Sequence, residues 1–301
     1  MRINTNISSL GAQEAAKNTN NSIASSLEKL STGLKINKAS DDASGLAIAD
    51  KLRTQVTSIN QGISNGNSAI ALLQIADKSM AEQGKILDTI KSKLIQANTD
   101  TTSSVGRVAI AKDVNKLLDQ LNNIAKQTNY NGTALLQKGM GSAAADTASS
   151  AGLTFQIGES NTDIISTKSI QANVTGYSLN SLKDNASAGA TATVSSDGKT
   201  VTANGFTRTM ASAAQLQIDN AITKLNGFRG DIGSTQNQVE SAVRNLMTQS
   251  TNIKAAESII RDVDYAEESA NFNKLNIISQ AGSYAISQSN ATQQNVLRLL
   301  Q

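Results

Sequence analysis

The sequence predicts a mainly α-helical protein: a long antiparallel helical bundle or coiled coil formed by the N- and C-terminal halves, with a small β-hairpin insertion in the middle. Two observations support this prediction. Apolar residues recur at heptad spacing in both halves of the 301-residue chain. Between the halves, the chain is rich in Ser, Thr, Ala, Gly and Asn, and short stretches alternate apolar and polar residues as half-buried strands do.

In the N-terminal half, apolar residues step by four, three and four from Ile23 through Leu27 and Leu30 to Leu34. Farther on, one position recurs every seven residues, and a companion position lies three residues after it. The two positions hold Ile59, Gly66, Leu73, Met80, Leu87 and Leu94, and Gly62, Ala69, Ala76, Gln83, Ile90 and Ala97. Another stripe comprises Ile110, Val114, Leu117, Leu121 and Ile124. Each stripe predicts a helix with one apolar face against partner helices.

The C-terminal half contains the longest seam. Its members are Ile218, Ile222, Leu225, Arg229, Ile232, Gln236, Val239, Val243, Leu246, Ser250, Ile253, Glu257 and Ile260. A helix of this length cannot bury its stripe alone, so we expect it to pack on the N-terminal helices or on other chains. The polar members weaken the seam but can fix its register.

The middle of the chain is expected to form a β-containing element and a short variable surface insertion. The stretch LTFQI at residues 153–157 alternates like a strand, and residues 193–196 and 199–202 flank Asp197-Gly198, a strong hairpin-turn signal. The expected division of the chain has three parts. They are residues 1–44 with 256–301, residues 45–140 with 211–255, and residues 141–210.

The two ends of the chain differ from the helical stripes. Residues 1–22 and 271–301 are loaded with Asn, Gln and Ser, and such polar segments are marginal as isolated helices in water. Large apolar residues such as Phe272 and Leu275 are nevertheless not expected in a tail that stays disordered. We therefore expect both ends to be loose in the monomer and to become ordered by packing between subunits.

Composition argues against several classes of function. The chain has no Cys and no His, so it lacks thiolates and the side chain most used for proton transfer and transition-metal binding. We expect no catalytic residue, no cofactor and no metal. A net charge of +3, spread along a chain with few aromatics, does not indicate a nucleic-acid partner. No apolar run approaches the roughly 20 residues that span a bilayer, so no membrane insertion is expected. The N-terminus lacks the pattern of a cleavable signal, which alone suggests a cytoplasmic protein.

Motifs at both ends resemble those of bacterial flagellins, over nearly all of residues 1–140 and 211–301. In chain order they are NTN at 4–6, LSTGLKIN at 30–37, DDASGLAIA at 41–49, TNYNG at 128–132, LTFQIG at 153–158, IIRDVDYAE at 259–267, QAG at 280–282 and QNVLRLL at 294–300. Each motif alone is weak evidence. Their occurrence in the correct order at both ends is highly specific.

The resemblance implies a structural subunit of the bacterial flagellar filament, which is exported unfolded and polymerised at the tip into a tubular helical propeller for motility. Its terminal helices would line the filament core and its longer helices the surrounding tube. The implied polymerisation core is Ile3, Ile7, Leu10, Ile23, Leu27, Leu30, Leu34, Phe272, Leu275, Ile278, Ile286, Val296, Leu297, Leu299 and Leu300. Residues 33–45 would form a linker in which Ser40 caps the next helix, with Asp41 and Asp42 favourable at its positive end.

The resemblance also implies a location and partners. The subunit would be secreted to the extracellular flagellum without a cleaved signal, through the flagellum-specific type III export apparatus, against the cytoplasmic suggestion of the N-terminus. Its partners would be other copies of itself, an export chaperone, the export apparatus, the filament cap and the hook–filament junction proteins.

One stretch departs from the flagellins that an innate immune receptor of the Toll-like class detects. The receptor motif Gln-Arg-Val-Arg-Glu-Leu falls here on Asp88, Thr89, Ile90, Lys91, Ser92 and Lys93. An Arg that can form forked hydrogen bonds becomes Thr89, a Glu becomes Ser92, and an apolar residue becomes Lys93. These changes resemble flagellins of lineages that evade the receptor, and they predict weak or absent activation.

The chain lacks the large outer domains of many flagellins and retains a short insertion around residues 175–210. Its candidate O-glycosylation sites are Ser195, Ser196 and Thr200. Two alternatives stay open at this point. A hook–filament junction protein shares both terminal signatures, and an enzyme would have to rely on carboxylates. Those carboxylates are Glu159, Asp163, Asp184 and Asp197, in an insertion that is small for a pocket.

Overall fold

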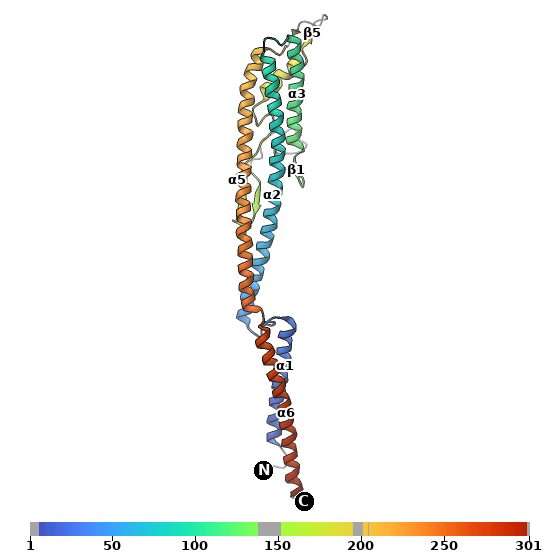
Figure 1. Ribbon diagram of the computed structural model, residues 1–301, viewed down its shortest axis with the longest axis vertical. Coiled ribbons are helices and arrows are strands. Elements are labelled where there is room, and N and C mark those ends of the chain that lie inside the picture. Colours follow the sequence, from blue (N-terminus) through green and yellow to red (C-terminus); the bar gives the residue numbers. More distant parts are fainter. Residues whose placement is uncertain (1–5, 138–151, 195–200, 204, 300–301) are drawn as a thin grey trace. The chain divides into compact units, whose positions relative to one another are not determined.

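The computed structural model (Figure 1) describes residues 6–137, 152–194, 201–203 and 205–299. The described residues form six helices: α1 (Ile7–Thr32), α2 (Ala43–Asn98), α3 (Ser104–Gln127), α4 (Asn180–Ala190), α5 (Arg208–Arg261) and α6 (Tyr265–Leu299). They also form three antiparallel strand pairs: β1 (Asn129–Tyr130) with β2 (Thr133–Ala134), β3 (Thr154–Gln156) with β4 (Ile164–Ser166), and β5 (Thr193–Val194) with β6 (Val201–Ala203). The predicted mainly α-helical fold is confirmed.

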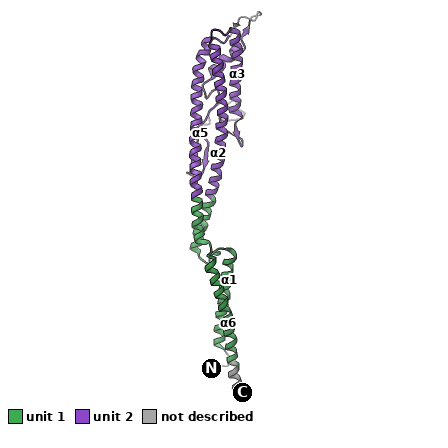
Figure 2. Cartoon of the chain, in the orientation of Figure 1, with its two compact units in different colours: residues 1–57, 249–301 green, residues 58–248 purple. Residues whose placement is uncertain are grey.

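The chain divides into two compact units (Figure 2). The terminal unit contains Met1–Thr57 and Gln249–Gln301, and the central unit contains Ser58–Thr248. Helices α1 and α6 belong wholly to the terminal unit, and α3 and α4 belong wholly to the central unit. The long helices α2 and α5 each contribute residues to both, so both halves of the sequence take part in both units.

In the central unit, α2, α3 and α5 lie side by side around one apolar core (Figure 1). All the predicted heptad positions of α2 from residue 59 to residue 97 are buried. Helix α5 runs antiparallel to α2, because Arg229 pairs with Asp77 while the later α2 residue Lys91 pairs with the earlier α5 residue Asp219. The heptad pattern therefore correctly identified the packed face of α2, and the expected antiparallel bundle is confirmed.

Of the thirteen positions of the seam predicted on α5, six are buried and the other seven are half-buried. Ile222 and Gln236 are half-buried, whereas Ala221 and Thr235, one residue earlier, are buried. Arg229 is also half-buried, and its Nε lies 2.8 Å from Oδ1 of Asp77. The hydrogen bond to Asp77 raises the pKa of the Arg229 guanidinium. This polar seam residue is thus accommodated at the edge of the core by a charged partner.

A buried polar cluster ties the chain before α4 to the helices. The Gln83 amide nitrogen donates to the carbonyl oxygens of Leu121 (3.2 Å) and Ala172 (2.8 Å), and its Oε1 accepts from the Tyr177 hydroxyl at 2.9 Å. Burial raises the pKa of the Tyr177 phenol well above its usual value, which keeps the phenol protonated as a donor. The Tyr177 ring also lies 6.3 Å from that of Phe228 on α5. One glutamine thereby joins α2, α3 and residues 172–177.

The middle of the chain contains the predicted strands and one helix that was not predicted. Strand β3 confirms the strand expected at residues 153–157, and it lies against α2: a Cβ at Gly62 would lie 1.8 Å from the carbonyl oxygen of Ile157. Strands β5 and β6 pair as the predicted hairpin, although its turn with Asp197-Gly198 lies outside the described residues. The unexpected helix α4 packs on α3 and buries Leu182 and Ala186.

Candidate functional site

The terminal unit is built on the antiparallel pair of α1 and α6, and several of the contacts between these helices are polar. Ser26 is buried, and its hydroxyl donates to Oε1 of Glu268 at 2.5 Å. Near the other end of α1, the Asn6 side chain donates to the carbonyl oxygen of Ser289 at 3.3 Å and also caps α1 by accepting from the Ser9 amide at 3.0 Å. Small and polar side chains therefore take up part of the inside of this pair, beside half-buried apolar residues such as Phe272 and Leu275.

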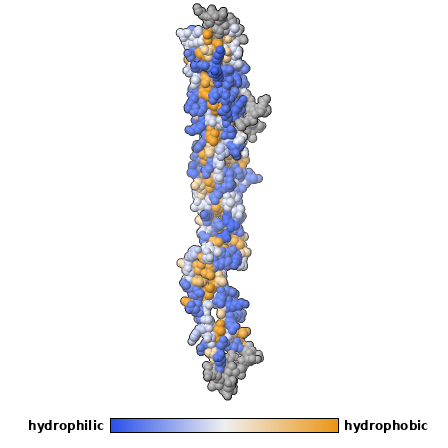
Figure 3. Space-filling model, turned by 90° about the vertical axis from the view of Figure 1, so that its right-hand side faces the viewer, coloured by the Kyte–Doolittle hydropathy of each residue, from blue (hydrophilic) through white to orange (hydrophobic). Residues whose placement is uncertain are grey.

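Large apolar side chains of the same two helices face outward. Ile7 is 71% exposed and Leu10 is 63% exposed on α1, while Ile277 is 67% exposed and Tyr284 is 73% exposed on α6. Hydrophobic surface is visible on the terminal unit in Figure 3. Exposed apolar side chains of this size mark a candidate interaction surface.

The described part of the terminal unit has almost no apolar core. Its buried hydrophobic residues are Ile36 and Ala49, whereas the central unit buries several dozen. Because hydrophobic burial is the main favourable term in folding, this unit gains little of that stabilisation from its own chain. Its exposed apolar surface is therefore the strongest candidate for a functional site in the molecule.

The structure places the implied polymerisation residues in different environments. Those that are exposed are Ile7, Leu10, Leu27 and Ile278, and those that are half-buried are Ile23, Leu30, Leu34, Phe272, Leu275 and Ile286. Val296, Leu297 and Leu299 lie in α6, and Ile3 and Leu300 lie outside the described residues. The residues implied by the resemblance do not include two prominent exposed residues, Ile277 and Tyr284. Their separation of seven residues, which puts them on one face of a helix, is the signal that indicates them.

Two connecting segments meet inside the terminal unit. Helix α1 ends at Gly33, which has φ of 74° and donates its amide to the carbonyl oxygen of Lys29 at 2.9 Å. Leu34 forms an isolated antiparallel bridge with Asp262, and the amide of Val263 donates to the carbonyl oxygen of Gly33 at 3.0 Å. A side chain at position 33 would lie 2.9 Å from the hydroxyl of Tyr265. The position thus requires glycine for its left-handed backbone and for the close approach of the tyrosine.

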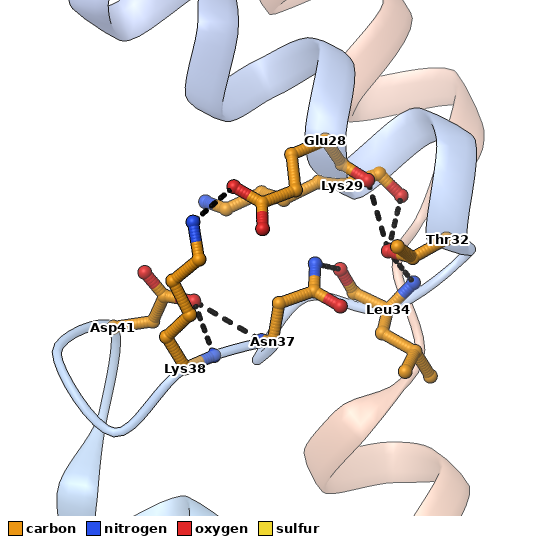
Figure 4. A network of polar contacts seen from close by, with 7 residues as sticks. All are labelled: Glu28, Lys29, Thr32, Leu34, Asn37, Lys38 and Asp41. Atoms are coloured by element: carbon orange, nitrogen blue, oxygen red, sulfur yellow. Dashed lines mark hydrogen bonds and ion pairs between the residues drawn. The ribbon is translucent and has the colours of Figure 1, made fainter.

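A network of charged and polar groups holds the segment after Gly33 (Figure 4). The carboxylate of Asp41 accepts from the backbone amides of Asn37 and Lys38, both at 3.0 Å. These two hydrogen bonds lower the pKa of the Asp41 carboxyl group. Lys38 in turn places its Nζ 2.7 Å from Oε2 of Glu28 on α1, and this hydrogen bond raises the pKa of the Lys38 ammonium. The connecting segment is therefore fixed to the end of α1.

The cap of α2 differs from the expectation. Ser40 was expected to cap this helix, but α2 begins at Ala43 and the residue that caps it is Asp42. Its Oδ1 accepts from the amides of Ser44 (3.0 Å) and Gly45 (2.9 Å). A carboxylate at this position also interacts favourably with the positive end of the helix dipole, as expected for the acidic pair.

The stretch that matches the receptor motif lies on α2 in the central unit. Ile90 is buried in the core, and Lys91 and Lys93 are half-buried and paired with Asp219 (2.5 Å) and Asp113 (3.1 Å). The exposed members are Asp88, Thr89 and Ser92, and the Thr89 hydroxyl donates to the carbonyl oxygen of Lys85 in its own helix. The surface at this stretch consequently presents no arginine.

The three described carboxylates of those considered for catalysis do not form a site. Glu159, Asp163 and Asp184 are all exposed, and Asp197 lies outside the described residues. Asp163 borders a groove of about 680 Å³ between the β3–β4 hairpin and α5, but its Oδ2 accepts from the Ser160 amide in its own turn. Within the described ranges, no group of three or more acidic side chains is placed to hold a metal ion.

No helix in the described part of the chain is long and apolar enough to cross a membrane.

Comparison with known proteins identifies the family. The bacterial flagellin N-terminal helical region matches residues 3–140, and the bacterial flagellin C-terminal helical region matches residues 216–300. Flagellin of Bacillus subtilis (strain 168) is 35% identical over 311 residues, with 100% of both chains covered. The flagellar filament 33 kDa core protein of Treponema phagedenis is 33% identical over 300 residues, again with 100% of both covered.

A solved structure shares the fold. The structure of a flagellar hook-associated protein from Vibrio parahaemolyticus matches with a TM-score of 0.57, covering 73% of this chain and 99% of that chain at 12% identity. At this identity the match shows a common helical architecture and does not distinguish a hook-associated protein from a filament protein.

Long paired helices with an exposed apolar surface are typical of a helical protein that associates with other protein chains. This chain belongs to the bacterial flagellin family. It is a structural subunit of the flagellar filament and not an enzyme, as predicted from the resemblance. The alternative of a hook–filament junction protein is not favoured.

Proposed function

We propose that the terminal unit is the part of this flagellin that polymerises, and that its core is completed by neighbouring copies. The supporting observation is that the described part of this unit buries Ile36 and Ala49 while its two longest helical segments expose large apolar side chains. Burying one such side chain contributes about 1.5–3 kcal/mol. Several of them on each subunit, repeated along a polymer, give a strong driving force for assembly.

The proposed polymerisation contacts include the residues implied by the resemblance and two that the structure adds, Ile277 and Tyr284. The corresponding division into domains assigns residues 1–44 and 256–301 to the inner core of the filament. Residues 45–140 and 211–255 would form the surrounding rod domain, and residues 141–210 the outer element. The filament-forming role then follows from terminal helices that reach a stable environment in the polymer.

The test is assembly of full-length protein that carries Ile277→Ser and Tyr284→Ser together. We expect this variant to assemble far less than the wild-type protein, as measured by pelleting of filaments and electron microscopy. Asn271→Ser is the matched control, because Asn271 is an exposed polar residue of the same helix that lies off the face of Ile277 and Tyr284. Normal filaments from the double variant would contradict the proposal, as would normal filaments from a protein that lacks residues 1–22 and 271–301.

We propose further that the subunit is secreted unfolded through the flagellar type III export apparatus and joins the extracellular filament at its tip. An export chaperone, the filament cap and the hook–filament junction proteins would be its partners. The absence of Pro and Cys from the sequence supports export as an extended chain, because no slow proline isomer and no disulfide can form. Export-defective cells that still release the protein in normal amounts would contradict this route.

We also propose that this flagellin activates the flagellin-sensing receptor weakly or not at all. The changes at Thr89, Ser92 and Lys93 support this proposal, because they replace a forked hydrogen-bond donor, an acid and an apolar side chain. Full potency of monomeric protein in a reporter-cell assay would overturn it.

Mass spectrometry of native protein tests the candidate O-glycosylation sites Ser195, Ser196 and Thr200, which lie outside the described residues.

A further inference from the structure

The turn between β1 and β2 belongs to the sequence motif TNYNG at residues 128–132. Asn131 and Gly132 form its two central residues, with φ of 48° and 81°. Positive φ at both positions is the signature of a type I′ hairpin turn, which favours the Asn-Gly pair. Both residues are exposed, and a Cβ built on Gly132 would meet no other atom within 4 Å.

The Asn-Gly pair also has a specific chemistry. The backbone nitrogen of the glycine, after losing its proton to solvent base, can attack Cγ of the preceding asparagine. A new C–N bond closes a succinimide ring, the bond from Cγ to the side-chain nitrogen breaks, and ammonia leaves with a proton from solvent. Water then opens the ring to an aspartyl or isoaspartyl residue. Glycine permits this attack best, because it has no side chain to shield the nitrogen.

The chain contains four Asn-Gly pairs, and the structure distinguishes three of them. The pairs at residues 65–66 and 226–227 lie inside the long helices α2 and α5. There the glycine nitrogen is a helix donor, and the asparagine reaches the ring-closing geometry only if the helix opens. The side chain of Asn65 is held further, because it donates to the carbonyl oxygen of Gln156 at 3.1 Å. The fourth pair, at residues 204–205, includes a residue outside the described ranges.

The hairpin that contains Asn131 opens more easily than the helices that contain the other two described pairs. It has two paired positions, 129 with 134 and 130 with 133, and an isolated two-stranded hairpin of this size is marginally stable in water. Below it, the amide of Leu135 donates to the carbonyl oxygen of Thr128 at 3.2 Å, and Leu135 and Leu136 are buried. The turn can therefore open locally while the base of the hairpin stays anchored in the core.

We propose that Asn131 is the preferred site of spontaneous deamidation among the described Asn-Gly pairs of this flagellin. The modification adds a negative charge to the surface of the central unit. In its isoaspartyl form it also adds a methylene group to the backbone of the turn. Because the reaction requires no enzyme, the modified fraction of the subunits increases with time after synthesis.

The experiment follows native full-length monomer in mildly alkaline buffer by peptide mapping with mass spectrometry, supported by an enzymatic assay for isoaspartyl residues. We expect conversion at residue 131 to be at least about tenfold faster than at residues 65 and 226, because opening a turn costs less than opening the middle of a helix. In denaturant, the three sites should convert at similar rates. Equal rates at the three sites in the native protein, or an equally large preference for residue 131 in denaturant, would overturn the proposal.

Two variants separate the chemistry from general effects on folding. Gly132→Ala shields the attacking nitrogen and should slow conversion at residue 131 severalfold in denaturant, where the strain that alanine would cause at the positive φ of residue 132 plays no part. Gly227→Ala is the matched control in α5, where an added Cβ meets no other atom within 4 Å, and it should leave conversion at residue 131 unchanged. An undiminished rate in the Gly132→Ala protein in denaturant would contradict the proposed attack by the Gly132 nitrogen.

Discussion

Replacement of Gln83 by methionine tests the polar cluster of the central unit most sharply. The side chain makes three hydrogen bonds in a buried environment: two that its amide donates to carbonyl oxygens and one that it accepts from Tyr177. Methionine has a similar shape but replaces none of them. A buried donor or acceptor that loses its partner costs about 1–3 kcal/mol. The carbonyl of Leu121 also accepts within α3, so the main losses are at Ala172 and Tyr177.

The expected net effect is a loss of about 2–4 kcal/mol, after the gain from burying an apolar side chain is subtracted. For a protein of this size that corresponds to a decrease in melting temperature of roughly 4–16 °C, measured by circular dichroism. Gln74→Met is the matched control, because Gln74 is an exposed residue of the same helix, and it should change stability by less than about 0.5 kcal/mol.

A double-mutant cycle with Tyr177→Phe completes this test. In the Gln83→Met background the tyrosine hydroxyl has lost its acceptor, so its removal should cost less than in the wild-type protein. The reasoning would be refuted if Gln83→Met cost no more than Gln74→Met, or if the effects of the two cluster substitutions were simply additive.

Three further predictions concern backbone and protonation. Gly33→Ala should loosen the connection after α1 by about 1–3 kcal/mol because φ is 74° there, and limited proteolysis should cut the linker faster than in the control Gly11→Ala. Asp41→Asn should speed hydrogen exchange of the two linker amides that donate to the carboxylate. The folded-state pKa of Asp41 is lowered. In the wild-type protein the two amides should therefore be protected from exchange above the unfolded-state pKa of Asp41, and this protection should disappear as the pH falls through its folded-state pKa. The raised pKa of Tyr177 means that its contribution to stability is complete below the unfolded pKa of about 10 and is lost as the pH rises above it, so Tyr177→Phe should flatten the decline of stability in alkaline urea titrations. Unchanged proteolysis, unchanged exchange or an unchanged alkaline slope would contradict the respective prediction.

The sequence predicted helix packing well where the heptad repeat is strong. On α2 the heptad period alone assigned Gly62 and Gln83 to the inner face, although neither is a typical core residue. Both residues are buried in the structure. On α5 the pattern could not choose between Ile222 and Ala221, because an edge position can hold the larger apolar side chain. Local pattern also missed α4, whose 11 residues bury mainly small side chains such as Ala186 and Gly189.

The candidate site could be predicted only in part. Low apolar density indicated unusual terminal segments, but it did not show that Ser26 would lie inside the α1–α6 pair while Ile277 and Tyr284 lie outside. That arrangement depends on the pairing of helices about 240 residues apart in the chain, as the hydrogen bond between Ser26 and Glu268 shows. Likewise, no local signal connects Gln83 with Tyr177.

The central claim is that the terminal helices gain their stability from neighbouring subunits. Hydrogen exchange of residues 7–22 and 271–299, compared between monomeric protein and assembled filaments, tests this claim most directly. The account predicts rapid exchange in the monomer and strong protection in the filament, with the core of the central unit protected in both. Equal and strong protection of the terminal helices in the monomer would contradict it.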